Sequence, residues 1–464
     1  MNRNFKKQLL ALFLAAAILL SLPVCASAQA PLVSPAPFSA GYLHSAVIKE
    51  DGSLWTAGAN TYGQLGNGAD GFDDEGELGD SADATEFVKV MDNVKAVYAG
   101  YLSTFAIDGG DTLWVWGWNE GGQLGIDDLE NKNKPVSLMD KVAMAAPGDY
   151  HSAVVTLDGE LYTFGWNQQG QLGNGTLKNA YAPQQVLSDV RIAAVGLEHT
   201  LAVKNDNTLW ACGDNSYGQL CDGTTNASSD FIQVMENVQS VAATAFGTLI
   251  LKTDGSVWAC GYNADAAVGN GSYEDVPEPV EILKGVQQIT ASRDFAAAVG
   301  KDGTLYAWGK NAYHQYGGET SSSPLEIAKN VDLVSTGGGH LMYLQDGTVY
   351  AMGNNERGQF GIGTTDDSAA PLNLLDDVAL VPNTSAFYVH GPTVLAIVVG
   401  VLVLIVFAFL IVRTLRGKPK NAKKKNSAKK KPTQKAQQKD LSQLSDEELL
   451  RMAEQMNASD EHRE

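Results

Sequence analysis

Short apolar runs recur along the chain at a nearly constant interval, and glycine-containing turns join them in pairs. In residues 148–175, the run HSAVV (151–155) is followed by Asp-Gly, by the run LYTFG (161–165) and by a glycine-rich loop. Two apolar runs joined by Asp-Gly predict a β-hairpin. A further apolar run lies on each side of such hairpins, as in VKAVYAG (94–100) and PVSLMD (135–140). Each unit therefore predicts four short antiparallel strands.

The same unit returns seven times. Its turn position falls at Gly52, Asp111, Gly159, Asn207, Gly255, Gly303 and Gly347, with spacings of 59, 48, 48, 48, 48 and 44 residues. A near-constant period of this length is typical of solenoids, propellers and repeat arrays. Seven four-stranded units predict an all-β fold, a seven-bladed β-propeller over residues 29–391. A linear β-solenoid is the alternative, although its repeats are usually shorter.

The repeat also carries a family resemblance. Its pattern reads G-x-x-H-[ST]-x-x-[VL], then DG-x-[LV]-[WY]-x-x-G-x-N-x-x-GQLG, and it covers residues 41–381. This pattern resembles the regulator of chromosome condensation repeat, which implies a seven-bladed propeller. The best-known member of that family is a nuclear exchange factor for a small GTPase, whereas a secreted bacterial inhibitor of β-lactamases shares the fold. The resemblance therefore supports the architecture and leaves the activity open.

Two series of side chains occupy one face of the third predicted strand, because residues two apart in a strand point the same way. The first series is Trp55, Trp114, Tyr162, Trp210, Trp258, Tyr306 and Tyr350, and the second is Ala57, Trp116, Phe164, Cys212, Cys260, Trp308 and Met352. A face this apolar is expected to pack against the neighbouring blade. The alternative is an aromatic ligand cage.

Four histidines hold one repeat position, at the start of the second strand: His44, His151, His199 and His340. A residue repeated in this way predicts a structural hydrogen bond in each blade rather than a catalytic group. The sequence lacks HExxH, GxSxG and P-loop motifs, so we expect no catalytic residue, no cofactor and no enzyme activity. The alternative is an extracellular hydrolase or lyase acting on cell-wall or polysaccharide material, with acids of shifted pKa drawn from several blades.

Three of the four cysteines lie in the repeat region, at positions 212, 221 and 260. Cys212 and Cys260 stand where other units place Trp, Phe or Met, so we interpret them as small buried hydrophobic residues. A Cys212–Cys260 disulfide between neighbouring blades is the alternative, and it requires Cα atoms within about 7 Å. Cys221 replaces the second glycine of GQLG and has no evident partner.

The first glycine-rich loop is 11 residues longer than the common period and holds eight acidic residues in 69–86. Such dense carboxylates make Asp70, Asp73, Asp74, Glu75 and Asp80 weak calcium candidates, because calcium prefers oxygen ligands. The spacing does not follow the EF-hand pattern. We favour a solvated acidic loop and expect no metal.

Aromatic side chains gather in the loops that strand alternation places at one end of the propeller. These loops follow the leading glycine of each unit and the glycine of G-x-N. The candidates for a binding face are Tyr42, Tyr101, Tyr150, Trp118, Trp166, Phe246 and Tyr262. Positions that vary between repeats and are rich in Tyr and Trp are typical of protein-binding surfaces. The alternative is that these rings are tucked against adjacent loops.

The two ends of the chain predict membrane insertion. Residues 1–28 have a basic start, an apolar run and Ala26-Ser27-Ala28, as a signal peptide has, with an uncleaved anchor as the alternative. Residues 392–412 contain a 20-residue uncharged run, which predicts a transmembrane helix rather than a buried core helix. The tail, 413–464, is basic and ends in a short acidic helix predicted at 445–456. The positive-inside rule then places the tail in the cytoplasm and the propeller outside.

Charge narrows the choice of partners. Residues 29–392 carry 16 basic and 45 acidic side chains, whereas residues 413–464 carry 14 basic and 8 acidic ones. An acidic repeat region argues against nucleic-acid binding, and a lysine-rich tail favours anionic membrane lipid. The sequence thus predicts a surface-anchored interaction, adhesion or inhibitor-like module whose partner is an extracellular or surface protein. An exchange-factor-like regulator is an alternative by family analogy only.

Overall fold

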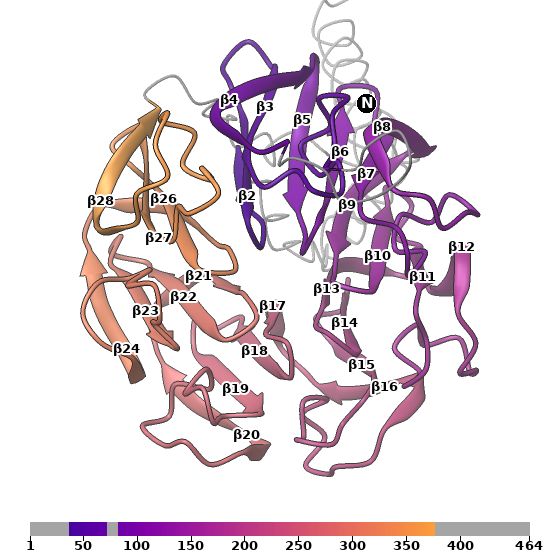
Figure 1. Ribbon diagram of the computed structural model, residues 1–464. Coiled ribbons are helices and arrows are strands. Elements are labelled where there is room, and N and C mark those ends of the chain that lie inside the picture. Colours follow the sequence, from indigo (N-terminus) through magenta and orange to yellow (C-terminus); the bar gives the residue numbers. More distant parts are fainter. Residues whose placement is uncertain (1–36, 72–81, 376–464) are drawn as a thin grey trace, which may run out of the picture. The chain divides into compact units, whose positions relative to one another are not determined.

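The computed structural model describes residues 37–71 and 82–375. Within these residues, 28 strands form seven four-stranded sheets, each built from four consecutive strands. The sheets follow one another around a ring, with the first strand of each sheet towards the centre (Figure 1). The seven-bladed β-propeller is therefore confirmed, and a linear solenoid is ruled out.

The strand bounds follow the repeat. Blades 1 and 2 are β1 (Phe38–Ala40), β2 (His44–Ile48), β3 (Leu54–Gly58), β4 (Ala84–Met91), β5 (Val94–Ala99), β6 (Ser103–Asp108), β7 (Leu113–Gly117) and β8 (Lys132–Met139). Blades 3 and 4 are β9 (Val142–Pro147), β10 (His151–Thr156), β11 (Leu161–Gly165), β12 (Ala180–Leu187), β13 (Val190–Val195), β14 (His199–Lys204), β15 (Leu209–Gly213) and β16 (Ser228–Met235). Blades 5 and 6 are β17 (Val238–Ala243), β18 (Gly247–Lys252), β19 (Val257–Gly261), β20 (Val276–Leu283), β21 (Val286–Ala291), β22 (Phe295–Gly300), β23 (Leu305–Gly309) and β24 (Ser321–Ala328). Blade 7 is β25 (Val331–Thr336), β26 (His340–Gln345), β27 (Thr348–Gly353) and β28 (Ser368–Leu375).

The asparagine of the G-x-N motif organises the loop that follows each third strand. In blade 3, Oδ1 of the buried Asn167 accepts a hydrogen bond of 2.9 Å from the backbone N–H of Leu172, and its Nδ2 donates to the carbonyls of Thr176 and Lys178. The side chain thereby satisfies backbone groups that a buried loop would otherwise leave unpaired. The equivalent Asn60 and Asn263 make the same bonds to Leu65 and Val268.

The second side-chain series of the third strand packs against the glycine-rich loop of the preceding blade. Trp116 of blade 2 donates from Nε1 to the carbonyl of Gln64 in blade 1, at 3.0 Å, and is fully buried. A Cβ at Gly66 would lie 2.6 Å from that indole nitrogen, so glycine is the residue that fits there. The expected blade-to-blade packing is confirmed.

The first series is half-buried, and three of its rings, Trp55, Trp210 and Trp258, are covered in part by lysines of their own hairpins. Lys204 lies 4.7 Å from the ring centroid of Trp210, whose Nε1 donates to Thr208. Lys49 and Trp55 repeat this arrangement in blade 1. These rings are thus parts of the hairpin turn rather than a ligand cage.

Each of the four repeated histidines makes the expected structural hydrogen bond, and its partner lies in the neighbouring blade. Nε2 of His44 lies 2.8 Å from Oγ1 of Thr104 in the next blade, and that hydroxyl donates to the carbonyl of Gln64. Because the hydroxyl proton is used on the carbonyl, the imidazole carries its proton on Nε2 and donates it. His151 and His199 make the same contact with Thr200 and Thr248.

These imidazoles are neutral and have no second partner. All four histidines are fully buried, and burial lowers the pKa of His44 and His199 to about 4 and of His151 and His340 to about 3. Nδ1 of each ring has no hydrogen-bond partner within the described residues. A proton added there would be a buried, uncompensated charge.

In three blades, the histidine ring explains the leading glycine of the repeat. A Cβ on Gly196 would lie 2.2 Å from Cε1 of His199 and 2.8 Å from the carbonyl of Thr244. Gly41 and Gly337 stand in the same way against His44 and His340, with 2.4 Å to Cε1 in both cases. The ring therefore occupies the space that any larger residue would need.

Gly196→Ala should lower the free energy of unfolding by about 3 kcal/mol, since overpacking a close-packed site typically costs this much. Gly110→Ala is the matched control: Gly110 is exposed, and its added Cβ would meet only a side-chain oxygen of Asp108, at 3.3 Å. Denaturant unfolding of the two variants measures the difference. Equal stability of the two would contradict this explanation of the repeat.

The disulfide joins Cys221 to Cys260, with Cα atoms 5.7 Å apart, while Cys212 is free and buried. The Cys212–Cys260 alternative is wrong, and so is the view of Cys260 as a plain buried hydrophobe. The physical reason is the packing seen for Gly66 and Trp116: the bulky third-strand residue of one blade faces the second glycine of GQLG in the preceding blade, which we call the junction rule. Cys221 holds the glycine position of blade 4 and Cys260 the bulky position of blade 5, so the two face each other across a junction.

The ring closes between blades 7 and 1 by the contacts used elsewhere. His340 Nε2 lies 2.9 Å from Ser45 Oγ, and the backbone N–H of Gly363 donates to the carbonyl of Thr85. Arg357 adds a two-pronged contact to the carboxylate of Asp83. The first strand, β1, and the last, β28, belong to different sheets. Closure in the described chain thus rests on side-chain packing and polar contacts rather than on a sheet shared by both ends.

Several predictions fall outside residues 37–71 and 82–375. The signal peptide 1–28, the transmembrane helix 392–412 and the tail 413–464 all do, as do the calcium candidates Asp73, Asp74, Glu75 and Asp80. In the described part of the chain, no helix has the length and apolar character of a membrane span.

Candidate functional site

Strand alternation sorts the loops between two ends of the propeller. The loops from first to second strand and from third to fourth strand share one end, which we call the upper face, and the hairpin turns lie at the other. Tyr42, Tyr101, Tyr150 and Phe246 come from the first kind of loop, and Trp118, Trp166 and Tyr262 from the second. All seven candidates are half-buried. They are therefore neither fully exposed nor tucked away.

Five of the seven candidates form a continuous row of rings over blades 1 to 3. Tyr42 lies 4.5 Å from Tyr101, Tyr101 lies 6.4 Å from Trp118, and Trp118 lies 5.5 Å from Tyr150, measured between ring centroids. Tyr150 then stacks on Trp166 at 4.6 Å. Tyr62, 6.0 Å from Trp118, joins this row, which we call the aromatic arc. The arc consists of Tyr42, Tyr62, Tyr101, Trp118, Tyr150 and Trp166.

Phe246 and Tyr262 belong to a second aromatic cluster, on blades 4 and 5. Their ring centroids are 6.2 Å apart, and Tyr217 lies 5.7 Å from the first and 5.1 Å from the second. The predicted face does not include Tyr62 and Tyr217, because they follow the G-x-N asparagine by two residues and the prediction rests on other loop positions. That position gives Tyr62, Gly121, Gln169, Tyr217, Asp265, Tyr313 and Arg357.

The upper face is hollowed at its centre, where the first strands of all blades end. The hollow has a volume of about 120 Å³ and takes residues from every blade. Directly after the leading glycine position the blades place Tyr42, Tyr101, Asp149, Leu197, Ala245, Arg293 and Gly338. Sequence comparison mixed this position with the next one, which holds Tyr150, Glu198 and Phe246. Asp149 and Leu197 were missed for that reason.

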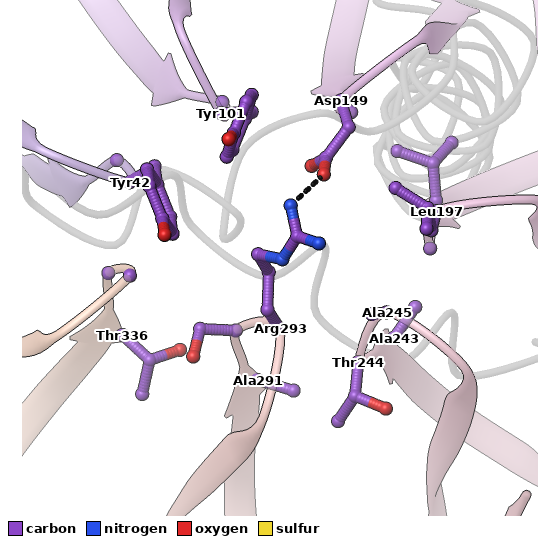
Figure 2. A pocket seen from close by; sticks show the side chains of 18 of the residues that line it. Tyr42, Tyr101, Asp149, Leu197, Ala243, Thr244, Ala245, Ala291, Arg293 and Thr336 are labelled. Carbon is purple, nitrogen blue, oxygen red and sulfur yellow. Dashed lines mark hydrogen bonds and ion pairs between the residues drawn. The ribbon is translucent and has the colours of Figure 1, made fainter. Parts of the chain in front are cut away.

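One ion pair crosses the hollow. Nη1 of Arg293, from blade 6, donates to Oδ2 of Asp149, from blade 3, at 2.7 Å (Figure 2). The guanidinium carbon of Arg293 also lies 5.2 Å from the ring centroid of Tyr101 and 5.8 Å from that of Tyr42. Arg293 thus fills a site made of two tyrosine rings and a carboxylate.

The carboxylates of this region are poorly solvated. Burial raises the pKa of Asp149 to about 6, and the charge of Arg293 opposes that shift. Burial also raises the pKa of Glu198 and of Asp294, whose carboxylate lies 3.0 Å from Nζ of Lys310. Asp149 is the one carboxylate among the lining residues, all of which lie in the described part of the chain.

Metal binding finds no support within the described residues. Asp70, the calcium candidate that the structure places, accepts a hydrogen bond of 2.7 Å from Asn133 of the next blade. No group of three histidine, cysteine or acidic side chains in residues 37–71 and 82–375 has the arrangement of a metal site.

Comparison with known families decides the relationship. Two models of the regulator of chromosome condensation (RCC1) repeat match the chain, one at residues 111–155, 158–203, 254–299 and 346–383 and the other at 38–64, 141–171, 190–219 and 286–315. The chain belongs to the RCC1-repeat family. The family resemblance inferred from the repeat pattern is thereby confirmed.

Individual proteins similar to this RCC1-repeat chain share its repeat or its fold. It is 31% identical over 96 residues to the X-linked retinitis pigmentosa GTPase regulator of Mus musculus and 32% identical over 104 residues to the ultraviolet-B receptor UVR8 of Arabidopsis thaliana. These segments span 8% and 21% of those two proteins. Among solved structures, human WBSCR16 is 21% identical with a TM-score of 0.60, over 70% of this chain and 94% of that one. Yeast RCC1 (Prp20) bound to Kap60 is 22% identical with a TM-score of 0.56, over 65% and 78%.

Proposed function

We propose that this RCC1-repeat propeller is a protein-binding module, anchored in the cell membrane by residues 392–412 and presented outside the cell. The aromatic arc is the observation that carries the proposal. Half-buried Tyr and Trp residues combine apolar area with few rotamers to fix, and such residues dominate the energetics of protein interfaces. The partner is an extracellular or surface protein.

Two further observations support this location. The Cys221–Cys260 disulfide suits an oxidising compartment, where such bonds persist. The sequence pattern of a signal peptide at 1–28 and a basic tail at 413–464 gives the same orientation, with the tail in the cytoplasm near anionic lipid. An exchange factor for a cytoplasmic GTPase would need the propeller on the other side of the membrane, so we do not propose that role.

A hydrolase or lyase whose active site is the central hollow is the second candidate function. General acid–base cleavage of a glycosidic bond ordinarily uses two carboxyl groups. The lining of the hollow supplies Asp149 alone, and Arg293 holds that carboxylate. The raised pKa of Asp149 is one feature that an acid catalyst would share.

The proposal is tested on intact cells that display the full-length chain. Purified surface and secreted proteins are added outside, and captured partners are identified after cross-linking. We expect Trp118→Leu with Tyr101→Leu to lower capture of a true partner at least tenfold, as loss of two interface anchors does. External protease should abolish capture while leaving the tail intact.

Leu157→Ser serves as the control, because Leu157 is 43% exposed in the hairpin turn of blade 3, at the opposite end. Capture that survives the double substitution, or that falls equally with Leu157→Ser, would refute the upper face as the binding surface. Capture that resists external protease would refute the location.

A further inference from the structure

The chemistry of the partner can be inferred from a contact that the chain makes with itself. Arg293 reaches across the hollow, places its guanidinium over Tyr101 and Tyr42, and pairs with Asp149. Its side chain is 37% exposed, so this arrangement forms at an open surface rather than in the core. The end of the aromatic arc therefore binds a guanidinium in the free protein. Arginine is the cation that combines stacking on a ring with a planar hydrogen-bonding edge.

The same kind of surface continues beyond Arg293. Trp118 and Tyr150 follow Tyr101 along the arc, with 5.5 Å between their ring centroids. The arc thus offers further ring faces for cations.

The charge around the arc also favours a cationic ligand. The upper loops of blades 1 and 2 contain Asp70, Asp83, Glu120, Asp127, Asp128 and Glu130, and no lysine or arginine at 59–71, 82–83 or 118–131. The upper loops of blade 3 add Asp149 and the exposed Lys178. Arg357, Lys132 and Asn133 reach in to contact Asp83, Asp128, Glu130 and Asp70. Glu120 and Asp127 are exposed. Residues 29–392 as a whole carry a net charge of −29, from 16 basic and 45 acidic side chains, which steers cationic partners towards the propeller.

We propose that the aromatic arc binds an extended segment of its protein partner through arginine side chains stacked on the rings, in the manner of Arg293 on Tyr42 and Tyr101. The inference rests on the proposed function, because it names the chemistry of the partner at the same face. The site formed by Tyr42, Tyr101 and Asp149 is the first arginine position of the arc, and Arg293 occupies it in the free protein. A partner arginine that takes this position displaces Arg293 from Asp149.

The test uses the full-length protein in detergent and three fluorescent peptides of about 12 residues, in which arginine, lysine or citrulline alternates with Gly-Ser. Citrulline keeps the shape of arginine and removes its charge. At about 150 mM salt we expect the arginine peptide to bind at least tenfold more tightly than the citrulline peptide and more tightly than the lysine peptide. Equal binding of the arginine and citrulline peptides, or of the arginine and lysine peptides, would overturn the proposal.

Variants separate stacking from general charge attraction. Trp118→Leu and Tyr101→Leu should each weaken the arginine peptide roughly fivefold, whereas Trp118→Tyr, which keeps a ring, and Tyr262→Leu, in the second cluster, should not. Arg293→Gln should tighten binding, because it vacates the first position. Lys310→Gln removes the same charge from the same blade without touching the arc and should leave binding unchanged.

Loss of binding in Tyr262→Leu to the same extent as in Trp118→Leu would refute the arc as the site. Equal tightening in Arg293→Gln and Lys310→Gln would refute the displacement of Arg293. If intact cells capture a partner through the upper face while the arginine peptide does not bind, this inference fails and the proposed function stands. If neither binds, both fail.

Discussion

Acidification from pH 7 to pH 4.5 should strongly destabilise the propeller, and the four buried histidines are the reason. Burial lowers their pKa to about 3 or 4 in the folded state, so they are neutral there, whereas the unfolded chain titrates near pH 6.5. The unfolded state therefore binds more protons below pH 6.5. The stability that depends on neutral imidazoles is complete above about pH 6.5 and is lost as the pH falls towards 4.

The magnitude follows from the number of protons. Each histidine contributes a slope of about 1.4 kcal/mol per pH unit below its unfolded pKa. Asp149 acts in the opposite direction: its pKa of about 6 lies above the unfolded value, so the folded state binds the extra proton between about pH 6 and pH 4. Four histidines less Asp149 give a slope of about 4 kcal/mol per pH unit for these five groups. Two pH units of acidification then remove about 8 kcal/mol, an amount within the range of about 5–15 kcal/mol for the stability of an ordinary domain.

Urea unfolding measured between pH 4 and pH 8 gives this slope directly. His199→Ser is an informative variant, because Ser103 occupies the same position in blade 2. The slope should fall by about 1.4 kcal/mol per pH unit, which corresponds to one proton. A free energy of unfolding that does not change between pH 7 and pH 5 would show that the imidazoles are not the controlling groups.

Reduction of the Cys221–Cys260 disulfide should lower the free energy of unfolding by about 4 kcal/mol. The bond closes a loop with a sequence separation of 39 residues, and the loss of chain entropy in the unfolded state predicts this value. Unfolding with and without reductant measures it. Cys212→Ser is the control, since Cys212 is outside the bond and the effect of the reductant should persist.

A paired substitution tests the junction rule behind the bond. Cys221→Gly with Cys260→Trp recreates the Gly66 and Trp116 pair of the first junction, where the indole donates to a loop carbonyl. We expect the double variant to be more stable than Cys221→Ser alone and insensitive to reductant. Equal stability of the two variants would contradict the rule.

The repeat made most of the fold predictable. Asp-Gly turns, apolar runs and a 48-residue period identify the strands, because these features depend on local backbone geometry that recurs in every blade. What the sequence left undetermined is the pairing between blades. The partner of His44 is Thr104, 60 residues away, and a pattern within one repeat cannot reveal it. The disulfide was missed for the same reason, as its two cysteines hold different repeat positions.

The candidate site was predictable only in part. Aromatic enrichment at variable loop positions identified five members of the arc, and the sixth, Tyr62, lies at a position that varies just as much. The ion pair between Arg293 and Asp149 joins residues 144 apart across the ring. The pair forms because seven blades close around a narrow axis. The repeat pattern does not show which residues then meet across that axis.

The closing junction described above also bears on how such a chain can be rearranged genetically. Because each blade is one uninterrupted segment and blade 7 meets blade 1 through the contacts found at other junctions, the start of the gene need not coincide with any particular blade. Circular permutation at another junction would preserve every pair of neighbours. Exchanging the order of two blades would not: moving blade 5 away from blade 4 would separate Cys221 from Cys260 and leave two unpaired thiols. The order of the blades is therefore constrained, whereas the junction at which the chain begins and ends is not.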